Sequence, residues 1–169
     1  FEVETRPPRI AYRETIGQGA AAQYRHKKQS GGAGQFGEVH LRVEPLPRGA
    51  GFEFVDQVKG GTIPGQFMPA VEKGVREALA EGAIAGYPVV DVRVIVHDGK
   101  HHPVDSKEIA FVTAGKRAVQ SAIREAGPVV LEPIARVQIT APENAMRAIT
   151  GDLSARRGLV SGTDSGQPG

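Results

Sequence analysis

The spacing of apolar and polar positions predicts strands in the first third of the chain. Residues 39–43 alternate strictly, and the segments 10–16 and 52–55 also have strand character. Alternation with a period of two is typical of a strand that buries one face. We therefore expect three strands here. They are separated by a Gly/Ala stretch, a basic run and a glycine turn at 30–34, and then by a Pro/Gly loop.

Helical spacing replaces this alternation in the middle of the chain. From 66 to 81 apolar residues recur every three or four positions, which is the period of an amphipathic helix, and Gly82 suits its C-terminal end. The segment 105–108 reads D-S-K-E, an acidic form of the capping box in which Asp105 would cap the next helix. That helix should end at 127–128 and bury these apolar side chains: Ile109, Val112, Val119 and Ile123.

Residues 88–96 are almost all β-branched, which predicts a buried strand followed by a turn at 97–99. A last strand at 135–140 and a helix from Pro142 would complete the order. Mixed strands and helices in this order predict an α+β fold. We expect the end of a preceding domain at 1–8, one whole domain at 9–130, and the truncated start of another at 131–169.

Composition removes several classes of protein. The 169 residues include 22 Gly and 12 Pro but no Cys, so disulfides, zinc–thiolate sites, iron–sulfur clusters and thiol catalysis are excluded. The chain has no apolar run near the roughly 20 residues of a membrane span, and its first residues do not resemble a signal peptide. We expect a cytoplasmic protein without a membrane partner.

Charge is nearly balanced overall but not locally. The 21 Lys and Arg residues exceed the 19 Asp and Glu residues by two. Between 6 and 28, however, the basic side chains Arg9, Arg13, Arg25 and Lys27 are opposed only by Glu14. A local excess of this kind can steer a protein onto phosphate, although it is equally compatible with an ordinary solvated face.

A glycine-rich segment, 29–37, is the first candidate for chemistry. It lacks the Gly-Lys-Ser/Thr of a nucleotide-binding loop, and a strand follows it where a dinucleotide fingerprint would have a helix. Glycine permits close approach of the backbone to another surface, so the segment suits contact with a nucleic-acid backbone; a hairpin tip without a ligand is the alternative. The candidate residues are Gln29, Ser30, Gly31, Gly32, Ala33, Gly34 and Gln35.

Histidines mark the second candidate segment, 97–105. His97, His101 and His102 invite a metal site, but they share one short segment without a cysteine or a helical glutamate. Stacking on bases or contact with phosphate fits these rings and Lys100 better, and a plain exposed turn stays open. The contact residues predicted here are Gly99, Lys100, His101 and His102.

Other reactive combinations are weaker. His102, Asp105 and Ser106 are sequence neighbours, but a nucleophile needs a base that a third group orients, and nothing supplies that arrangement. We therefore expect no catalytic residue and no metal in this chain. Arg156 and Arg157 could complement a helix C-terminus or clamp phosphate.

Seven ordered segments of the chain match one known family. They are A-Y-R-E-T-I at 11–16, Q-S-G-G-A-G-Q-F-G at 29–37, G-G-T-I-P-G-Q-F-M-P-A-V-E-K-G at 60–74, G-Y-P-V-V-D-V at 86–92, V-D-S-K-E-I-A-F at 104–111, L-E-P-I-A-R-V at 131–137 and G-D-L-S-A-R-R-G at 151–158. Together they resemble the fourth domain of elongation factor G and the beginning of its fifth. The resemblance covers nearly all of 8–162.

The resemblance implies a translational GTPase that acts on the ribosome as a monomer, with GTP and magnesium held by an N-terminal domain absent from this chain. It implies a mixed sheet with helices on one face and a left-handed βαβ crossover, as in a domain of a small-subunit ribosomal protein, followed by a ferredoxin-like unit. The loops at 29–35 and 99–103 would contact the tRNA–mRNA duplex in the decoding region during translocation. Arg156 and Arg157 would face the large subunit.

Departures from the family pattern, which include a poor fit of residues 17–26, leave a divergent paralogue open, and two further alternatives do not depend on them. Ala33 stands where family members commonly have Arg, and His101-His102 stands where they commonly have Tyr-His. A divergent paralogue acting in ribosome recycling or ribosome protection is one alternative. A stand-alone RNA-binding module is another, and an enzyme domain with a metal on His97, His101 and His102 is the third.

Overall fold

The structure is a computed structural model that describes residues 12–29, 31–133, 145, 148 and 151. The chain divides into two compact units, 1–133 and 134–169. The first unit contains every helix and strand discussed below. The strand expected at 135–140, the helix expected from Pro142, and Arg156 and Arg157 lie outside the described residues.

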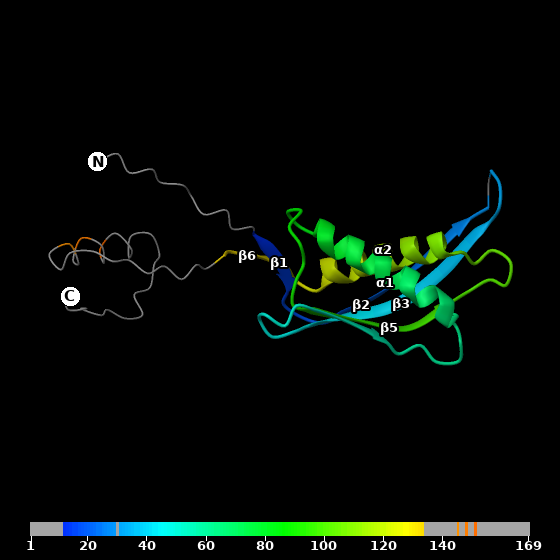
Figure 1. The fold of residues 1–169 in the computed structure, drawn as a ribbon, viewed down its shortest axis with the longest axis horizontal. Coiled ribbons are helices and arrows are strands. Elements are labelled where there is room, and N and C mark those ends of the chain that lie inside the picture. Colours follow the sequence, from blue (N-terminus) through cyan, green and yellow to red (C-terminus); the bar gives the residue numbers. More distant parts are fainter. Residues whose placement is uncertain (1–11, 30, 134–144, 146–147, 149–150, 152–169) are drawn as a thin grey trace, which may run out of the picture. The chain divides into compact units, whose positions relative to one another are not determined.

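The first unit has an α+β fold, as the sequence predicted (Figure 1). Within the described residues, none of the helices is long and apolar enough to cross a membrane. The elements are β1 (Arg13–Ile16), β2 (Ala20–Lys28), β3 (Gln35–Pro45), β4 (Phe52–Asp56), the 3-10 turn η1 (Gly65–Phe67), α1 (Met68–Glu81), β5 (Val92–Lys100), α2 (Glu108–Glu125) and β6 (Pro128–Leu131).

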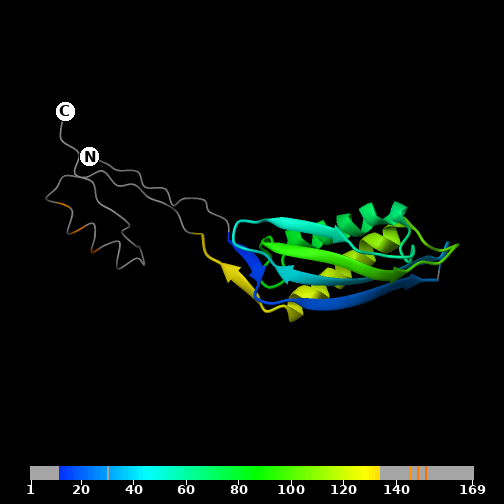
Figure 2. The ribbon, with the colours of Figure 1, turned by 90° about the horizontal axis from the view of Figure 1, so that it is seen from below.

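Four of these strands form a mixed sheet in the order β2-β3-β5-β4. The strand β3 runs antiparallel to both of its neighbours, β2 and β5, while β4 pairs in parallel with β5 through the α1 crossover. Both helices lie on one face of this sheet (Figures 1 and 2). The left-handed sense of the crossover stays a prediction.

The core lies between that face and the two helices. Alternate residues of β3 and β5 point into it and are fully buried, and the rings of Phe67 and Phe111 stack 4.7 Å apart inside it. The helical stripe predicted along α1 is confirmed, because its apolar residues are buried. The fully buried core side chains include Val39, Leu41, Val43, Val71, Val75, Val92, Val94, Val96, Phe111 and Val119.

The two helices cross at glycines. A Cβ on Gly74 of α1 would collide with the carbonyl oxygen of Val112, and a Cβ on Gly115 of α2 would lie 2.8 Å from the carbonyl oxygen of Val71. The helix backbones therefore approach more closely than any side chain at these positions would permit. These two glycines set the distance between α1 and α2.

The prediction of one strand over 88–96 is wrong at both ends. Asp91 has φ 60°, a left-handed conformation that interrupts an extended chain, and β5 begins only at the next residue. Its carboxylate accepts hydrogen bonds from the N–H groups of Gly49 and Gly51 at 3.1 and 2.9 Å, so Asp91 holds the preceding loop. The turn expected at 97–99 is absent, because β5 continues to Lys100.

The start of α2 also differs from the prediction. Lys107 occupies the N-cap without a side-chain cap hydrogen bond, so the expected capping box does not form. Ile109 is 52% exposed and Val112 is only partly buried, whereas Val119 and Ile123 are buried as expected. The helix ends at Glu125, before Gly127 with φ 63°, which confirms the predicted stop.

At the other end of the unit, β1 pairs antiparallel with β6, a strand that the sequence did not predict. The Glu14 side chain of β1 is fully buried. Its carboxylate accepts hydrogen bonds from four backbone N–H groups at 2.7–3.0 Å, those of Ala83, Ile84, Ala85 and Tyr87. Burial raises the pKa of Glu14, but these four donors outweigh it, and the net pKa lies below the ordinary 4.5.

Candidate nucleic-acid interface

Two loops lie at the end of the four-stranded sheet farthest from β1 and β6 (Figure 1). One joins β2 to β3 in a hairpin, and the other joins β5 to α2. The strand register places them together, because Lys28 pairs with Gln35 at the end of the hairpin and Glu38 pairs with Lys100. We call residues 29–34 and 101–107 the tip loops.

The hairpin tip loop exposes glycine backbone. Gly31 and Gly32 have φ values of 80° and 135°, and nothing lies within 4 Å of the position of a Cβ on either. Both φ values strongly favour glycine, and the open space lets another molecule reach the backbone. Gln29 and Ala33 are also exposed, Gly34 and Gln35 are half-buried, and Ser30 lies outside the described residues.

Hydrogen bonds tie the tip loop 101–107 to the start of β3, next to the hairpin tip loop. The Phe36 N–H donates to the carbonyl oxygen of Asp105 at 2.9 Å, and the Ser106 hydroxyl donates to the Phe36 carbonyl at 3.2 Å. The same hydroxyl accepts the backbone N–H of His102 at 2.7 Å. Ser106 therefore connects the tip loop 101–107 to β3. The sequence did not reveal this positioning role, although Ser106 lies within the segment V-D-S-K-E-I-A-F.

The rings of His101 and His102 are exposed at the tip, and each has a fixed partner. His101 Nδ1 lies 3.0 Å from the carbonyl oxygen of Thr62. His102 Nδ1 lies 3.2 Å from the backbone nitrogens of both Val104 and Asp105. The loop 57–64, which precedes η1, therefore also contributes to the tip, although no sequence pattern indicated it.

Gly99 does not belong to a tip loop, contrary to the sequence-based boundary. It is a buried residue of β5, paired with Val39, and a Cβ there would collide with the Glu38 carbonyl and lie 2.5 Å from Ile63 Cγ1. Glycine is required at position 99 because a side chain there would collide with Glu38 and Ile63. Lys100, the next residue, is exposed and ends β5 at the tip.

Unpaired positive charge gathers at this end of the sheet. Lys27, Lys28 and Lys100 are exposed, and within the described residues none of them lies in a salt bridge. Farther along the helix-free face of the sheet, basic side chains are paired: Arg42 with Glu44 at 3.3 Å, and Arg93 with Glu53 at 2.7 Å. Among the basic side chains of the four-stranded sheet, those outside the salt bridges of the described residues therefore lie at the tip.

Glu38 is a buried carboxylate on the same face of the sheet, and it contacts Arg25 and His40. Its buried carboxylate lies 2.7 Å from Arg25 Nε and 2.9 Å from His40 Nε2. Burial raises the pKa of Glu38, but the hydrogen bonds from His40 and Arg25 lower it to below the ordinary value. Arg25 also lies over the Phe36 ring, 5.9 Å from its centroid, so the ion pair borders the tip.

The histidines of the sequence-based metal hypothesis have separate surroundings. His97 packs edge-on against His40, with ring centroids 6.4 Å apart, while the rings of His101 and His102 bond to Thr62 and to the 102–105 turn. Among the described residues, no group of three or more His, Asp or Glu side chains is placed to hold a metal ion.

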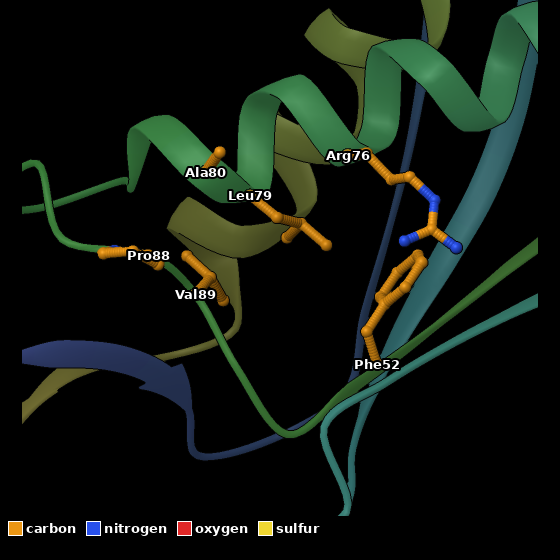
Figure 3. Close-up of a pocket in the computed structure, with 6 residues that line it drawn as sticks. All are labelled: Phe52, Arg76, Leu79, Ala80, Pro88 and Val89. Atoms are coloured by element: carbon orange, nitrogen blue, oxygen red, sulfur yellow. The ribbon is translucent and has the colours of Figure 1, made fainter.

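A shallow hollow of about 170 Å³ lies between α1 and the segment before β5 (Figure 3). Arg76 covers the Phe52 ring there, with its guanidinium carbon 4.8 Å from the ring centroid. The hollow is smaller than a typical small-molecule site of about 300–1,000 Å³. Its lining residues are Phe52, Arg76, Leu79, Ala80, Pro88 and Val89.

Comparison with known proteins gives the class of this chain. The family model "Elongation factor G, domain IV" matches residues 8–127, so the chain belongs to that family. An elongation factor G-like protein of Thermotoga maritima is 50% identical over 163 residues, which cover 96% of this chain and 24% of the relative. Elongation factor G of Aquifex pyrophilus is 49% identical over 165 residues, covering 98% of this chain and 24% of the relative.

A solved structure has the same fold. A protein of Thermus thermophilus superposes with a TM-score of 0.87 at 41% identity, covering 95% of this chain and 24% of that protein. This likeness agrees with the α+β architecture described above. The chain thus spans about a quarter of the length of each of these relatives.

Proposed function

We propose that this chain is the ribosome-engaging part of an elongation-factor-G-like translation factor. Its tip loops enter the decoding region of the small subunit, contact the tRNA–mRNA duplex and promote translocation. GTP and magnesium are bound by another domain of the parent protein, which carries the GTPase activity. Family membership over 8–127 supports the role in translation. The exposed residues of the tip loops support the contact with RNA.

The observation that carries the contact is the coincidence of three properties at one end of the sheet. Gly31 and Gly32 leave backbone open to a close approach, and two histidine rings are exposed on the other tip loop. Exposed lysines outside the salt bridges of the described residues supply positive charge at the same end. RNA offers phosphates for the lysines and planar bases or ribose groups for the rings.

Rapid-kinetic translocation by the full-length parent tests this function. The double variant Gly31→Val, His102→Ala should slow translocation at least about tenfold, which corresponds to losing about 1.4 kcal/mol of transition-state stabilisation. GTP hydrolysis on ribosomes should continue at its original rate. Unchanged translocation in the double variant would overturn the proposal, and an equal loss of GTP hydrolysis would show that the tip has a different role.

Arg93→Ala is a matched control on the same sheet. Arg93 pairs with Glu53 and Glu44 and is not part of the tip loops, so its loss should leave translocation unchanged. A parallel assay of ribosome splitting separates a translocation factor from a recycling factor. The translocation proposal requires the tip variant to affect movement of tRNA and mRNA more than splitting.

A further inference from the structure

The two histidines of the tip are held as opposite tautomers by their backbone partners. Two amide N–H groups, of Val104 and Asp105, point at Nδ1 of His102 at 3.2 Å. An amide N–H can only donate, so this ring nitrogen accepts and carries no proton. The neutral ring then has its proton on Nε2, and the exposed edge of His102 is a hydrogen-bond donor.

His101 has the reverse arrangement. Its Nδ1 lies 3.0 Å from the carbonyl oxygen of Thr62, and a carbonyl can only accept, so Nδ1 carries the proton. The neutral ring therefore has a free lone pair on Nε2, and the exposed edge of His101 is an acceptor. Neighbouring histidines thus offer one donor and one acceptor from the same turn.

The segments that position both rings are fixed to the sheet and to the core. The His102 turn is anchored to β3 through Ser106, which bonds the His102 N–H at 2.7 Å and the Phe36 carbonyl at 3.2 Å. The partner of His101 directly precedes Ile63, whose side chain is only 2% exposed in the core. The Asp105 carboxylate lies 3.8 Å from His102 Nδ1, beyond hydrogen-bond distance, and does not compete with the amides.

We propose that His101 and His102 form a donor–acceptor pair that selects ribose over deoxyribose, with His101 as the specificity-determining residue. A ribose 2′-hydroxyl donates a hydrogen bond to His101 Nε2. The Nε2–H of His102 donates a hydrogen bond to an oxygen of the same strand. The 2′-hydroxyl is a donor that DNA lacks, so the pair distinguishes RNA from DNA. This inference rests on the proposed contact with RNA and adds the group that is recognised.

Long-range ¹H–¹⁵N NMR of the 169-residue chain at neutral or mildly basic pH tests the tautomers directly. Protonated and bare ring nitrogens differ strongly in ¹⁵N chemical shift. His101 should show a protonated Nδ1, and His102 should show a protonated Nε2. The same tautomer in both rings, or averaging between tautomers in either ring, would overturn the inference without bearing on the translocation assay.

A matched pair of oligonucleotides tests the selectivity. A short single-stranded RNA and its 2′-deoxy counterpart with the same bases are titrated into the labelled chain. The RNA should bind about 2- to 10-fold more tightly, the range expected for one hydrogen bond, and should shift the His101 Nε2 signal. Equal affinity for the two strands, or no binding of either strand, would overturn the inference that the pair selects ribose.

Two substitutions connect the selectivity to His101. His101→Phe keeps a planar ring but removes the acceptor, and it should abolish the preference for RNA. His101→Gln keeps an oxygen acceptor and should retain part of the preference. If both variants preferred RNA as strongly as the original chain, another residue would carry the selectivity and the proposal would fail. Ribosome-dependent translocation by the His102→Ala parent reports separately on the proposed function.

Discussion

Gly34 and Asp105 lie in contact across the two tip loops. A Cβ on Gly34 would lie 2.7 Å from the carboxyl carbon of Asp105 and within 2.9 Å of both carboxylate oxygens. Real Cβ atoms do not approach so closely, so any larger residue at 34 displaces the Asp105 side chain. Glycine at 34 therefore leaves the Asp105 carboxylate room to pack against the hairpin tip loop.

We predict that Gly34→Ala disturbs the junction between the loops. The Phe36 N–H, which donates to the Asp105 carbonyl at 2.9 Å, should exchange with solvent faster, while the melting temperature changes little because the core is untouched. Hydrogen exchange followed by NMR measures this. The double variant Gly34→Ala, Asp105→Ala removes the clash and should restore protection at Phe36. Failure of the second substitution to restore it would contradict the contact as the cause.

A second prediction concerns the crossing of the helices. Gly74→Ala should destabilise the first unit by about 1–3 kcal/mol, because overpacking at the Val112 carbonyl outweighs the helix propensity gained with alanine. Chemical denaturation measures the loss. Gly65→Ala is the control, since nothing lies within 4 Å of the position of its Cβ. Equal stability of the two variants would show that the helices can separate at no cost.

The buried carboxylate of Glu14 should make stability depend on pH. Its pKa is lowered in the folded state, so its contribution is complete above the ordinary value of 4.5 and is lost as the pH falls through the lower folded-state pKa. The melting temperature should therefore fall below about pH 4.5 more steeply than in Glu14→Gln. Calorimetry from neutral to acidic pH checks this, and parallel curves for both proteins would contradict it.

Glu14→Gln should also destabilise the unit at neutral pH. Four backbone N–H groups surround the carboxylate, and an amide replaces one of its acceptor oxygens with a donor that faces two of them. Unsatisfied buried donors cost about 1–3 kcal/mol each, so we expect a loss of about 2–4 kcal/mol in chemical denaturation. Glu72→Gln, which affects only an exposed pair with Arg76, serves as the control.

The elements that sequence reasoning found are those whose own side chains enter the core. The periodicity of α1 and the alternation in β3 record burial directly. The edge strand β2 was missed because its residues are mostly exposed, and it forms through its pairing with β3 from Ala20 to Lys28. The strand β6 was missed for a similar reason, since β1 is its partner far away in the sequence.

The site was predictable in its residue types but not in its geometry. Glycine and histidine marked the two tip loops, whereas burial of Gly99 depends on Ile63 and on the Glu38 carbonyl packed against it. The capping-box prediction failed because Asp105 and Ser106 serve the junction with Phe36 and leave the start of α2 uncapped by a side chain. Contacts of this kind join segments about 70 residues apart, and no local pattern encodes them.

The last prediction compares Lys100, an exposed lysine at the tip, with Arg93, which lies in salt bridges on the same sheet. Binding of the chain to a single-stranded RNA oligonucleotide should weaken as salt rises, and Lys100→Ala should reduce the slope of log K against log salt by about 0.7, the release of one counterion. Arg93→Ala should leave the slope unchanged and lower the melting temperature, because Arg93 is bonded to Glu53 at 2.7 Å and to Glu44 at 3.3 Å. Fluorescence anisotropy at several salt concentrations measures both slopes. A larger change in slope for Arg93 than for Lys100 would move the RNA-binding surface from the tip to the middle of the sheet.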